Sequence, residues 1–147
     1  GTSYLVMKVI EWRTLSAEGA CAPARAVGLF ERVCETVALP HSRGIVHRDL
    51  KPANVMVGAF GEVLVMDWGL AKELGAPDAD APDADSVPGA TQLGSVKGTP
   101  AFMAPEQARG EPIDARADVF ALGGVLAGLL TGQPVLEGDT AWKTVEL

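Results

Sequence analysis

The sequence predicts an α+β fold that is mainly helical and carries small β-hairpins. Residues 24–41 have apolar side chains at helical spacing, residues 118–131 are apolar on nearly every face, and residues 55–66 contain two β-rich runs around a turn. With 147 residues, 48% of them hydrophobic, the chain can bury one sizeable core and does not require two domains. We therefore expect one globular unit, or part of one.

The first β-rich run, from Leu5 to Ile10, begins almost at the first residue. No turn or earlier strand precedes it, so we expect its sheet to continue outside this sequence. At the other end, the residues that follow Pro134 are too few to complete another layer. The fold is therefore expected to be incomplete at both ends.

Two helices are predicted. The first covers residues 24–41, where apolar side chains at helical spacing should pack on the core. These side chains are Val27, Phe30, Cys34 and Val37. The second runs over residues 118–131, and its apolar faces predict a helix that is buried all round. Glycines within it should let neighbours approach closely, and Gly132 followed by Pro134 should end it.

Between these helices, residues 55–66 are predicted to form a β-hairpin because Gly58 and Gly61 permit the turn between its strands. The two glycines therefore belong to a turn and not to a phosphate-binding loop. Further along, residues 76–80 are repeated letter for letter as residues 81–85. This proline- and acid-rich repeat cannot bury apolar surface, so we expect it to be disordered.

The composition argues against several classes of function. The net charge of −7, without a cluster of Lys and Arg, argues against nucleic acid as a partner. Cys21 and Cys34 lie 13 residues apart without a second pair, which indicates reduced thiols instead of a zinc site or a disulfide framework. The longest apolar stretch, residues 119–130, is too short to span a bilayer. We expect a cytoplasmic segment without membrane contact.

The most informative feature is the run from His47 to Met56, which places an acid, a base and an amide at the spacing that a phosphoryl-transfer loop needs. On a tight loop Asp49 and Lys51 can face the same reacting centre, while Asn54 enters the following strand. The hairpin should then deliver Asp67 opposite Asn54. A single Asp or Asn in a loop usually caps a turn, so the argument depends on the ordered set.

Two further motifs follow in order, Asp67-Trp68-Gly69 and the run from Gly98 to Glu106. Together the three motifs resemble the signature of the protein kinase family, most closely that of the bacterial eukaryotic-like Ser/Thr kinases. The resemblance covers essentially the whole chain. It implies the mainly helical large lobe of the protein-kinase fold, and it implies ATP-dependent phosphorylation of Ser or Thr residues on proteins within a signalling kinase.

The resemblance implies a role for each residue of the reacting centre. Asp49 would accept the proton of the substrate hydroxyl, and Lys51 would steady the γ-phosphate. Asn54 and Asp67 would hold Mg²⁺ against the phosphates. Thr99 would lie beside the catalytic aspartate, which favours Ser or Thr over Tyr as the acceptor. ATP and Mg²⁺ are therefore the expected cofactors.

Structural roles are implied for five other residues. His47 would join the first motif to the second, and Trp68, where the family usually has phenylalanine, would fill the same apolar spine beside Gly69. Glu106 would be a buried carboxylate whose arginine partner is expected beyond the end of this sequence. Asp118 would receive backbone donors from the first motif, although an acid also suits the start of any helix.

The adenine pocket is implied by residues near the N-terminus. Met7 would occupy the gatekeeper place, and the backbones of Lys8 and Ile10 would bind adenine. Met56 would form the floor of this pocket, although a methionine in an apolar strand is also a usual core residue.

A regulatory contact is implied for Arg48. In kinases that are organised by phosphorylation, this arginine pairs with a phosphate through a bidentate contact. The candidate acceptors here are Thr91 and Ser95. The alternative is a plain surface arginine.

The resemblance also divides the chain into four parts. These are the last small-lobe strand and hinge (1–11), the helical lobe with its catalytic loop and metal-binding hairpin (12–69), the activation segment (70–106), and the buried helix with the start of the next (107–147). The implied partners are ATP and a protein substrate with a Ser or Thr acceptor, and a second kinase chain is allowed as a dimer partner. The parent protein can still be membrane-anchored.

The sequence lacks a G-x-G-x-x-G loop, a V-A-I-K lysine and the helix glutamate that pairs with it. Two hypotheses follow. In the first, the chain is the large lobe of an active Ser/Thr kinase and is inactive by itself. In the second, it is a pseudokinase-like protein-binding module that docks a partner kinase. The intact acids and amide of the first two motifs favour the first hypothesis.

Overall fold

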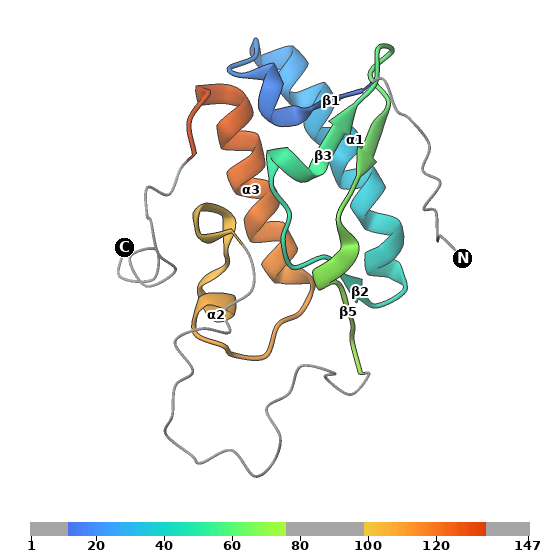
Figure 1. Cartoon of the computed structure of the whole chain (residues 1–147), viewed down its shortest axis with the longest axis vertical. Helices are drawn as coiled ribbons and strands as arrows, with labels where there is room; N and C mark the ends of the chain where they lie inside the picture. Colours follow the sequence, from blue (N-terminus) through green and yellow to red (C-terminus); the bar gives the residue numbers. More distant parts are fainter. Residues whose placement is uncertain (1–11, 76–98, 135–147) are drawn as a thin grey trace, which may run out of the picture.

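The computed structural model describes residues 12–75 and 99–134. Within them, helix α1 packs against helix α3 and against a small antiparallel sheet (Figure 1). The predicted strand at residues 5–10 and the predicted disordered repeat at residues 76–85 lie outside the described residues. The described part has the mainly helical α+β composition that the sequence predicts.

In the described residues, ten short elements accompany the two long helices α1 and α3. The helices are α1 (Pro23–Ser42), α2 (Pro105–Ala108) and α3 (Ala115–Thr131). One sheet has the strand order β1-β3-β4, built from Arg13–Thr14, Val55–Val57 and Val63–Val65, and a second pairs β2 (Ile45–Val46) with β5 (Lys72–Glu73). Single 3₁₀ turns occur at Leu15–Glu18, Pro52–Asn54, Trp68–Leu70 and Pro100–Phe102.

Helix α1 forms where the sequence predicts it, but three of its four buried residues lie one position before those that we expected, and only Val37 is shared. The side chains that it buries are Ala26, Leu29, Val33 and Val37. Val27, which we expected in the core, is 55% exposed, while Phe30 and Cys34 pack at the edge of the core. Two adjacent stripes of this helix are apolar, and the neighbouring sheet and α3 decide which one is covered.

Helix α3 begins three residues earlier than predicted. Asp114 is its N-cap and accepts a hydrogen bond from the Arg116 amide at 2.8 Å. The helix ends as expected at Gly132, whose φ of +74° is easily adopted only by glycine. The prediction that α3 is buried all round is wrong for the described residues, because Val119 is 60% exposed and one face is not covered.

The predicted β-hairpin is confirmed. Val55 pairs with Val65 and Val57 pairs with Val63. The Gly58 amide donates to the Glu62 carbonyl at 2.9 Å, which closes the turn. Met66, which we placed in the second strand, lies just past its end.

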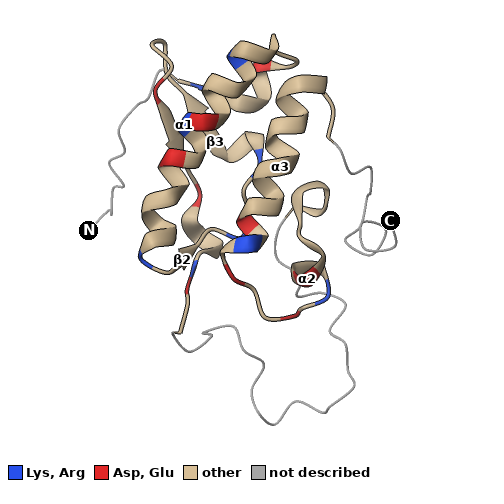
Figure 2. Ribbon diagram, turned by 180° about the vertical axis from the view of Figure 1, so that it is seen from behind, with Lys and Arg blue, Asp and Glu red and all other residues tan. Residues whose placement is uncertain are grey.

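Charged residues are scattered over the described part of the fold in small groups of both signs (Figure 2). No helix in the described ranges is long and apolar enough to cross a membrane.

Candidate active site

A single buried carboxylate ties the loop between β2 and β3 to helix α3. Asp118 is 1% exposed, and its two oxygens accept the backbone amides of His47 at 2.8 Å and Arg48 at 2.9 Å. His41, near the end of α1, places Nε2 2.7 Å from the same carboxylate. The loop therefore leaves β2 in a direction that two helices fix. These bonds also hold Arg48 at a φ of +69°, which non-glycine residues adopt only under tertiary constraint.

His47 connects this loop to the end of the hairpin. Its Nδ1 accepts the Asp49 amide at 3.2 Å, so the proton of the neutral ring lies on Nε2 and is donated to the Met66 carbonyl at 2.9 Å. The edge of the ring meets Trp68, with the ring centres 4.6 Å apart. The Trp68 indole in turn donates to the Val65 carbonyl at 3.0 Å. The first and second motifs are thus joined through one buried histidine.

Asp49 stands at the centre of a hydrogen-bond network. Its Oδ1 accepts the Thr99 amide at 2.9 Å and the Thr99 hydroxyl at 3.0 Å. Its Oδ2 accepts the Lys51 ammonium at 2.7 Å and the Asn54 amide at 3.2 Å. Lys51 also donates to the Thr99 hydroxyl at 2.7 Å, which closes a ring of three side chains. The carboxylate is therefore oriented by four donors from two distant segments.

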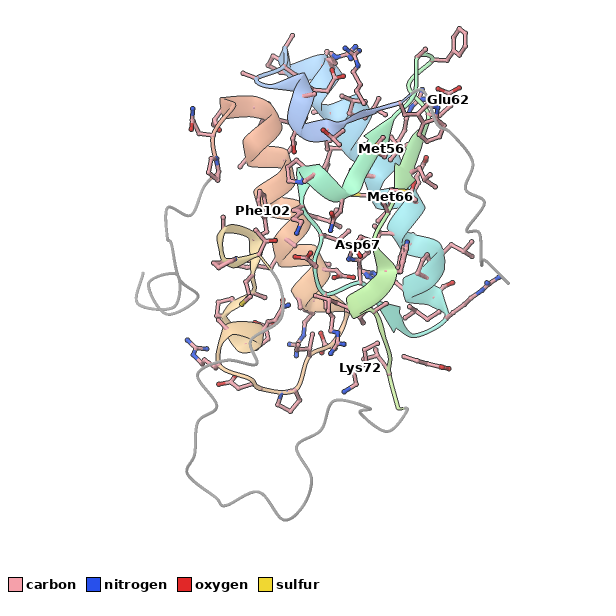
Figure 3. All side chains as sticks on the ribbon, viewed as in Figure 1. Met56, Glu62, Met66, Asp67, Lys72 and Phe102 are labelled. Atoms are coloured by element: carbon pink, nitrogen blue, oxygen red, sulfur yellow. The ribbon has the colours of Figure 1, made fainter. Side chains whose placement is uncertain are left out.

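Asn54 and Asp67 supply the oxygen atoms that suit a magnesium ion. The Asn54 Nδ2 also donates to the Asp49 carbonyl at 2.9 Å, so its Oδ1 faces the other way. The Met66 amide donates to the Asn54 carbonyl at 2.8 Å, which places Asp67 one residue further along, beside the loop; Figure 3 shows Asp67 just past the end of β4. Across residues 12–75 and 99–134, no donor contacts the exposed Asp67 carboxylate.

The oxygen atoms of Asn54 and Asp67 fit Mg²⁺ as ligands in number and kind. Mg²⁺ prefers oxygen ligands and usually takes one or two from the protein, with the rest from phosphates and water. In the described part of the chain, no three His, Cys, Asp or Glu side chains gather as a metal site. A magnesium ion here would therefore depend on Asp67, Asn54 and the oxygens of a bound nucleotide.

Other predicted site residues lie around this centre. Adding a Cβ at Gly69 would bring it 3.3 Å from Asp67 Oδ1, so the glycine leaves room for the carboxylate. Met56 lies on β3 on the face opposite Val55 and Val57. Some predicted residues lie outside the described residues, namely Met7, Lys8, Ile10, Thr91 and Ser95.

Two expectations change with the structure. Glu106 is only partly buried, whereas we expected a fully buried carboxylate. The hydrogen bond and charge of Asp114 raise the pKa of Arg116, and Glu106 adds to this rise. Arg48 uses its Nε to bond the Leu70 carbonyl, so its guanidinium already has one protein partner.

Sequence reasoning missed two residues that hold the loop. His41 carries no motif signal, because its partner Asp118 is 77 residues away. Gln107 donates to the Arg48 carbonyl at 2.6 Å, and its position directly after Glu106 in the third motif is the signal that was available.

A cavity of about 330 Å³ opens beside Lys51 and Thr99. Its walls are mostly apolar and include Leu15, Phe102 and Leu129. The cavity therefore gives access to the Asp49 network from the side of α3.

The site combines an oriented aspartate with a neighbouring lysine and threonine, and it adds an amide and a second aspartate beside the hairpin. This combination is typical of the phosphoryl-transfer enzymes to which protein kinases belong. The family model described as the protein kinase domain matches residues 2–146. The chain belongs to the protein kinase domain family, and it has that family's fold. Protein kinases generally use ATP and Mg²⁺.

The chain is similar to named bacterial kinases. It is 41% identical over 141 residues to the serine/threonine-protein kinase PknB of Mycobacterium tuberculosis strain H37Rv and to that of Mycolicibacterium smegmatis, covering 93% of this chain. It is 40% identical over 146 residues, 95% of this chain, to a probable serine/threonine-protein kinase PknB of Corynebacterium glutamicum. The chain spans 21% of the length of each of these relatives. The resemblance to bacterial Ser/Thr kinases is confirmed.

Proposed function

We propose that this chain forms the large, mainly helical lobe of a Ser/Thr protein kinase that transfers the γ-phosphoryl group of ATP to a hydroxyl group of a protein. The observation that carries the proposal is the Asp49 carboxylate, held by Thr99 on one oxygen and by Lys51 and Asn54 on the other. The printed names of the relatives at 40–41% identity support the same activity.

In this proposal Asp49 is the base. Its direction is fixed before a substrate arrives, because each oxygen already accepts two hydrogen bonds. A substrate hydroxyl within hydrogen-bond reach would give its proton to Asp49 as its oxygen bonds to the γ-phosphorus of ATP and the bond from that phosphorus to the ADP oxygen breaks, so that ADP leaves. The Lys51 ammonium lies between Asp49 and Thr99, where it would stabilise negative charge on the transferred group.

Asn54 Oδ1 and the Asp67 carboxylate would hold the metal. A magnesium ion held there would supply positive charge that offsets the negative charge of the phosphates. Asp67 suits this role because no group in the described ranges competes for its oxygens. Its φ of +60° is tolerated by aspartate and directs the chain into the 3₁₀ turn at Trp68–Leu70.

The remaining parts of the lobe extend this proposal. Residues 1–11 would supply the last small-lobe strand and the hinge, with Met7, Lys8 and Ile10 at the adenine and Met56 beneath it. Residues 12–69, 70–106 and 107–147 would be the helical lobe, the activation segment and the buried helix with the start of the next.

Arg48 would serve as the regulatory contact. Its Nε is bonded to Leu70, and its two NH₂ groups would bind a phosphate on Thr91 or Ser95. Such a contact would add charge-assisted bonds to the loop that carries Asp49.

The 147 residues by themselves should bind nucleotide weakly and transfer little phosphate. They contain neither a G-x-G-x-x-G loop nor a V-A-I-K lysine, so two groups that hold the phosphates are missing. A calorimetric titration of this chain with Mg-ATP should give no micromolar binding.

The decisive experiment uses the protein made from the uninterrupted reading frame that contains this chain. It should phosphorylate a basic test protein on Ser or Thr in the presence of Mg-ATP, and Asp49→Asn should abolish transfer. Glu35→Gln is a matched control, because it makes the same chemical change at an exposed position of α1. Equal, measurable rates in wild type and Asp49→Asn would reject Asp49 as the base, whereas absence of transfer by the wild type would favour the pseudokinase-like binding module.

A further inference from the structure

We propose that Gln107 is a positioning residue for Asp49 and that it acts through the carbonyl group of Arg48. Gln107 lies on α2 and is 8% exposed, and its Nε2 donates to the Arg48 carbonyl oxygen at 2.6 Å. The two residues are 59 positions apart in the sequence. The proposal rests on the proposed function, because it assigns a role to Gln107 in the same reaction.

The bond matters because it fixes the peptide group that leads directly into Asp49. The oxygen of this group is held by Gln107, and its N–H, which belongs to Asp49, donates to His47 Nδ1 at 3.2 Å. The preceding peptide group is held by Asp118, which accepts the Arg48 amide at 2.9 Å. Side chains are therefore hydrogen-bonded to both peptide groups that flank Arg48. Its left-handed φ of +69° makes this stretch of backbone depend on them.

Because of Gln107, the segment of residues 99–107 contacts the region of Asp49 at both of its ends. Thr99 at the start of residues 99–107 holds the side chain of Asp49, while Gln107 at the end holds the Arg48 carbonyl in the peptide group that precedes Asp49. A displacement of this segment would release both contacts together. The direction of the Asp49 carboxylate is thus set by where the segment 99–107 lies.

The chemistry of the contact selects an amide at position 107. A carbonyl oxygen can only accept, so its partner must be a donor. Glutamate has the same shape but would place an acceptor against an acceptor, and methionine has a similar length without a donor. Gln107→Glu and Gln107→Met therefore remove the same bond in two different ways.

The test measures backbone hydrogen exchange by mass spectrometry on the protein from the full reading frame. The peptide that covers residues 46–50 should exchange roughly fivefold faster in both Gln107 variants, as expected for one lost hydrogen bond. Peptides from α1 should keep their wild-type rates. Gln133→Glu, the same change at an exposed position after α3, should alter neither. A general loss of stability would instead accelerate exchange in α1 as well and would overturn the proposal.

A kinetic measurement on the same variants tests the positioning role. Both should lower kcat while KM for ATP stays near the wild-type value, because the nucleotide contacts are not touched. Unchanged exchange at residues 46–50, or faster exchange with an unchanged kcat, would overturn the proposal. Absence of phosphoryl transfer in the wild type would count against the proposed function instead, and the exchange data would still decide whether Gln107 holds the loop.

Discussion

His41 and Asp118 lie 77 residues apart in the sequence, yet His41 Nε2 is 2.7 Å from the Asp118 carboxylate. The same carboxylate accepts two amides of the 47–54 loop. One buried acid therefore connects α1, α3 and the loop, and the stability of the fold and the direction of the loop depend on the same group.

Replacement of Asp118 should be costly for stability. Asp118→Ala would leave two buried amides and His41 without their acceptor, so the free energy of unfolding should fall by about 3–5 kcal/mol. Urea unfolding measures this difference. Glu35→Gln, an exposed change on α1, should stay within about 0.5 kcal/mol of the wild type. A loss of less than about 1 kcal/mol in Asp118→Ala would mean that the buried network contributes little.

The Thr99 hydroxyl should affect catalysis more than stability. It donates to Asp49 and accepts from Lys51, so Thr99→Ala removes both contacts while the backbone amide bond to Asp49 remains. We expect kcat of the full kinase to fall roughly ten- to hundredfold, as for a misdirected catalytic group. Thr99→Ser keeps the hydroxyl and should retain most of the activity. Equal rates in the alanine and serine variants would contradict this role.

The adjacent glycines of α3 offer a matched pair for packing. A Cβ at Gly123 would meet nothing within 4 Å, so Gly123→Ala should raise the free energy of unfolding by about 0.5–1 kcal/mol through helix propensity. A Cβ at Gly124 would lie 3.1 Å from the Phe102 ring. Gly124→Ala should therefore gain less or lose stability. Thermal unfolding compares the two, and an equal gain would show that Phe102 moves aside freely.

Because Asp114 is charged, the free energy of unfolding should depend on pH. A side-chain hydrogen bond from Arg116, aided by the Arg116 amide, lowers the pKa of Asp114. A lowered pKa in the folded state contributes stability above the unfolded pKa, and this contribution is lost as pH falls through the folded pKa. Asp114→Asn keeps an N-cap without the charge. The wild type should be more stable at neutral pH, and the difference should vanish in acid.

Urea midpoints at a series of pH values would follow this difference. A gap between Asp114 and its asparagine variant that stays constant from neutral to acidic pH would show that the charge plays no part.

Local signals in the sequence predicted the hairpin and the two long helices, because glycine turns and helical spacing depend on near neighbours. The ordered motifs and their resemblance to a known family predicted that Lys51 and Thr99 lie beside Asp49, and the catalytic roles of these residues stay predictions. The buried face of α1 was misjudged since Val27 and Ala26 belong to adjacent stripes, and only tertiary contacts choose between them. His41 and Gln107 were missed for a related reason. Their partners, the Asp118 carboxylate and the Arg48 carbonyl, are distant in the sequence, and neither residue type has a spacing rule that indicates such a contact.

The segment between β5 and Thr99 is fastened at both ends, since β5 pairs with β2 and Thr99 is bonded to Asp49. A connection whose two ends are anchored on one body can change in length at little energetic expense, roughly 0.6 kcal/mol for each doubling. The duplicated five-residue block at positions 76–85 falls within this connection. The duplicated block therefore lengthens a connection between two anchored ends at little cost in folding free energy.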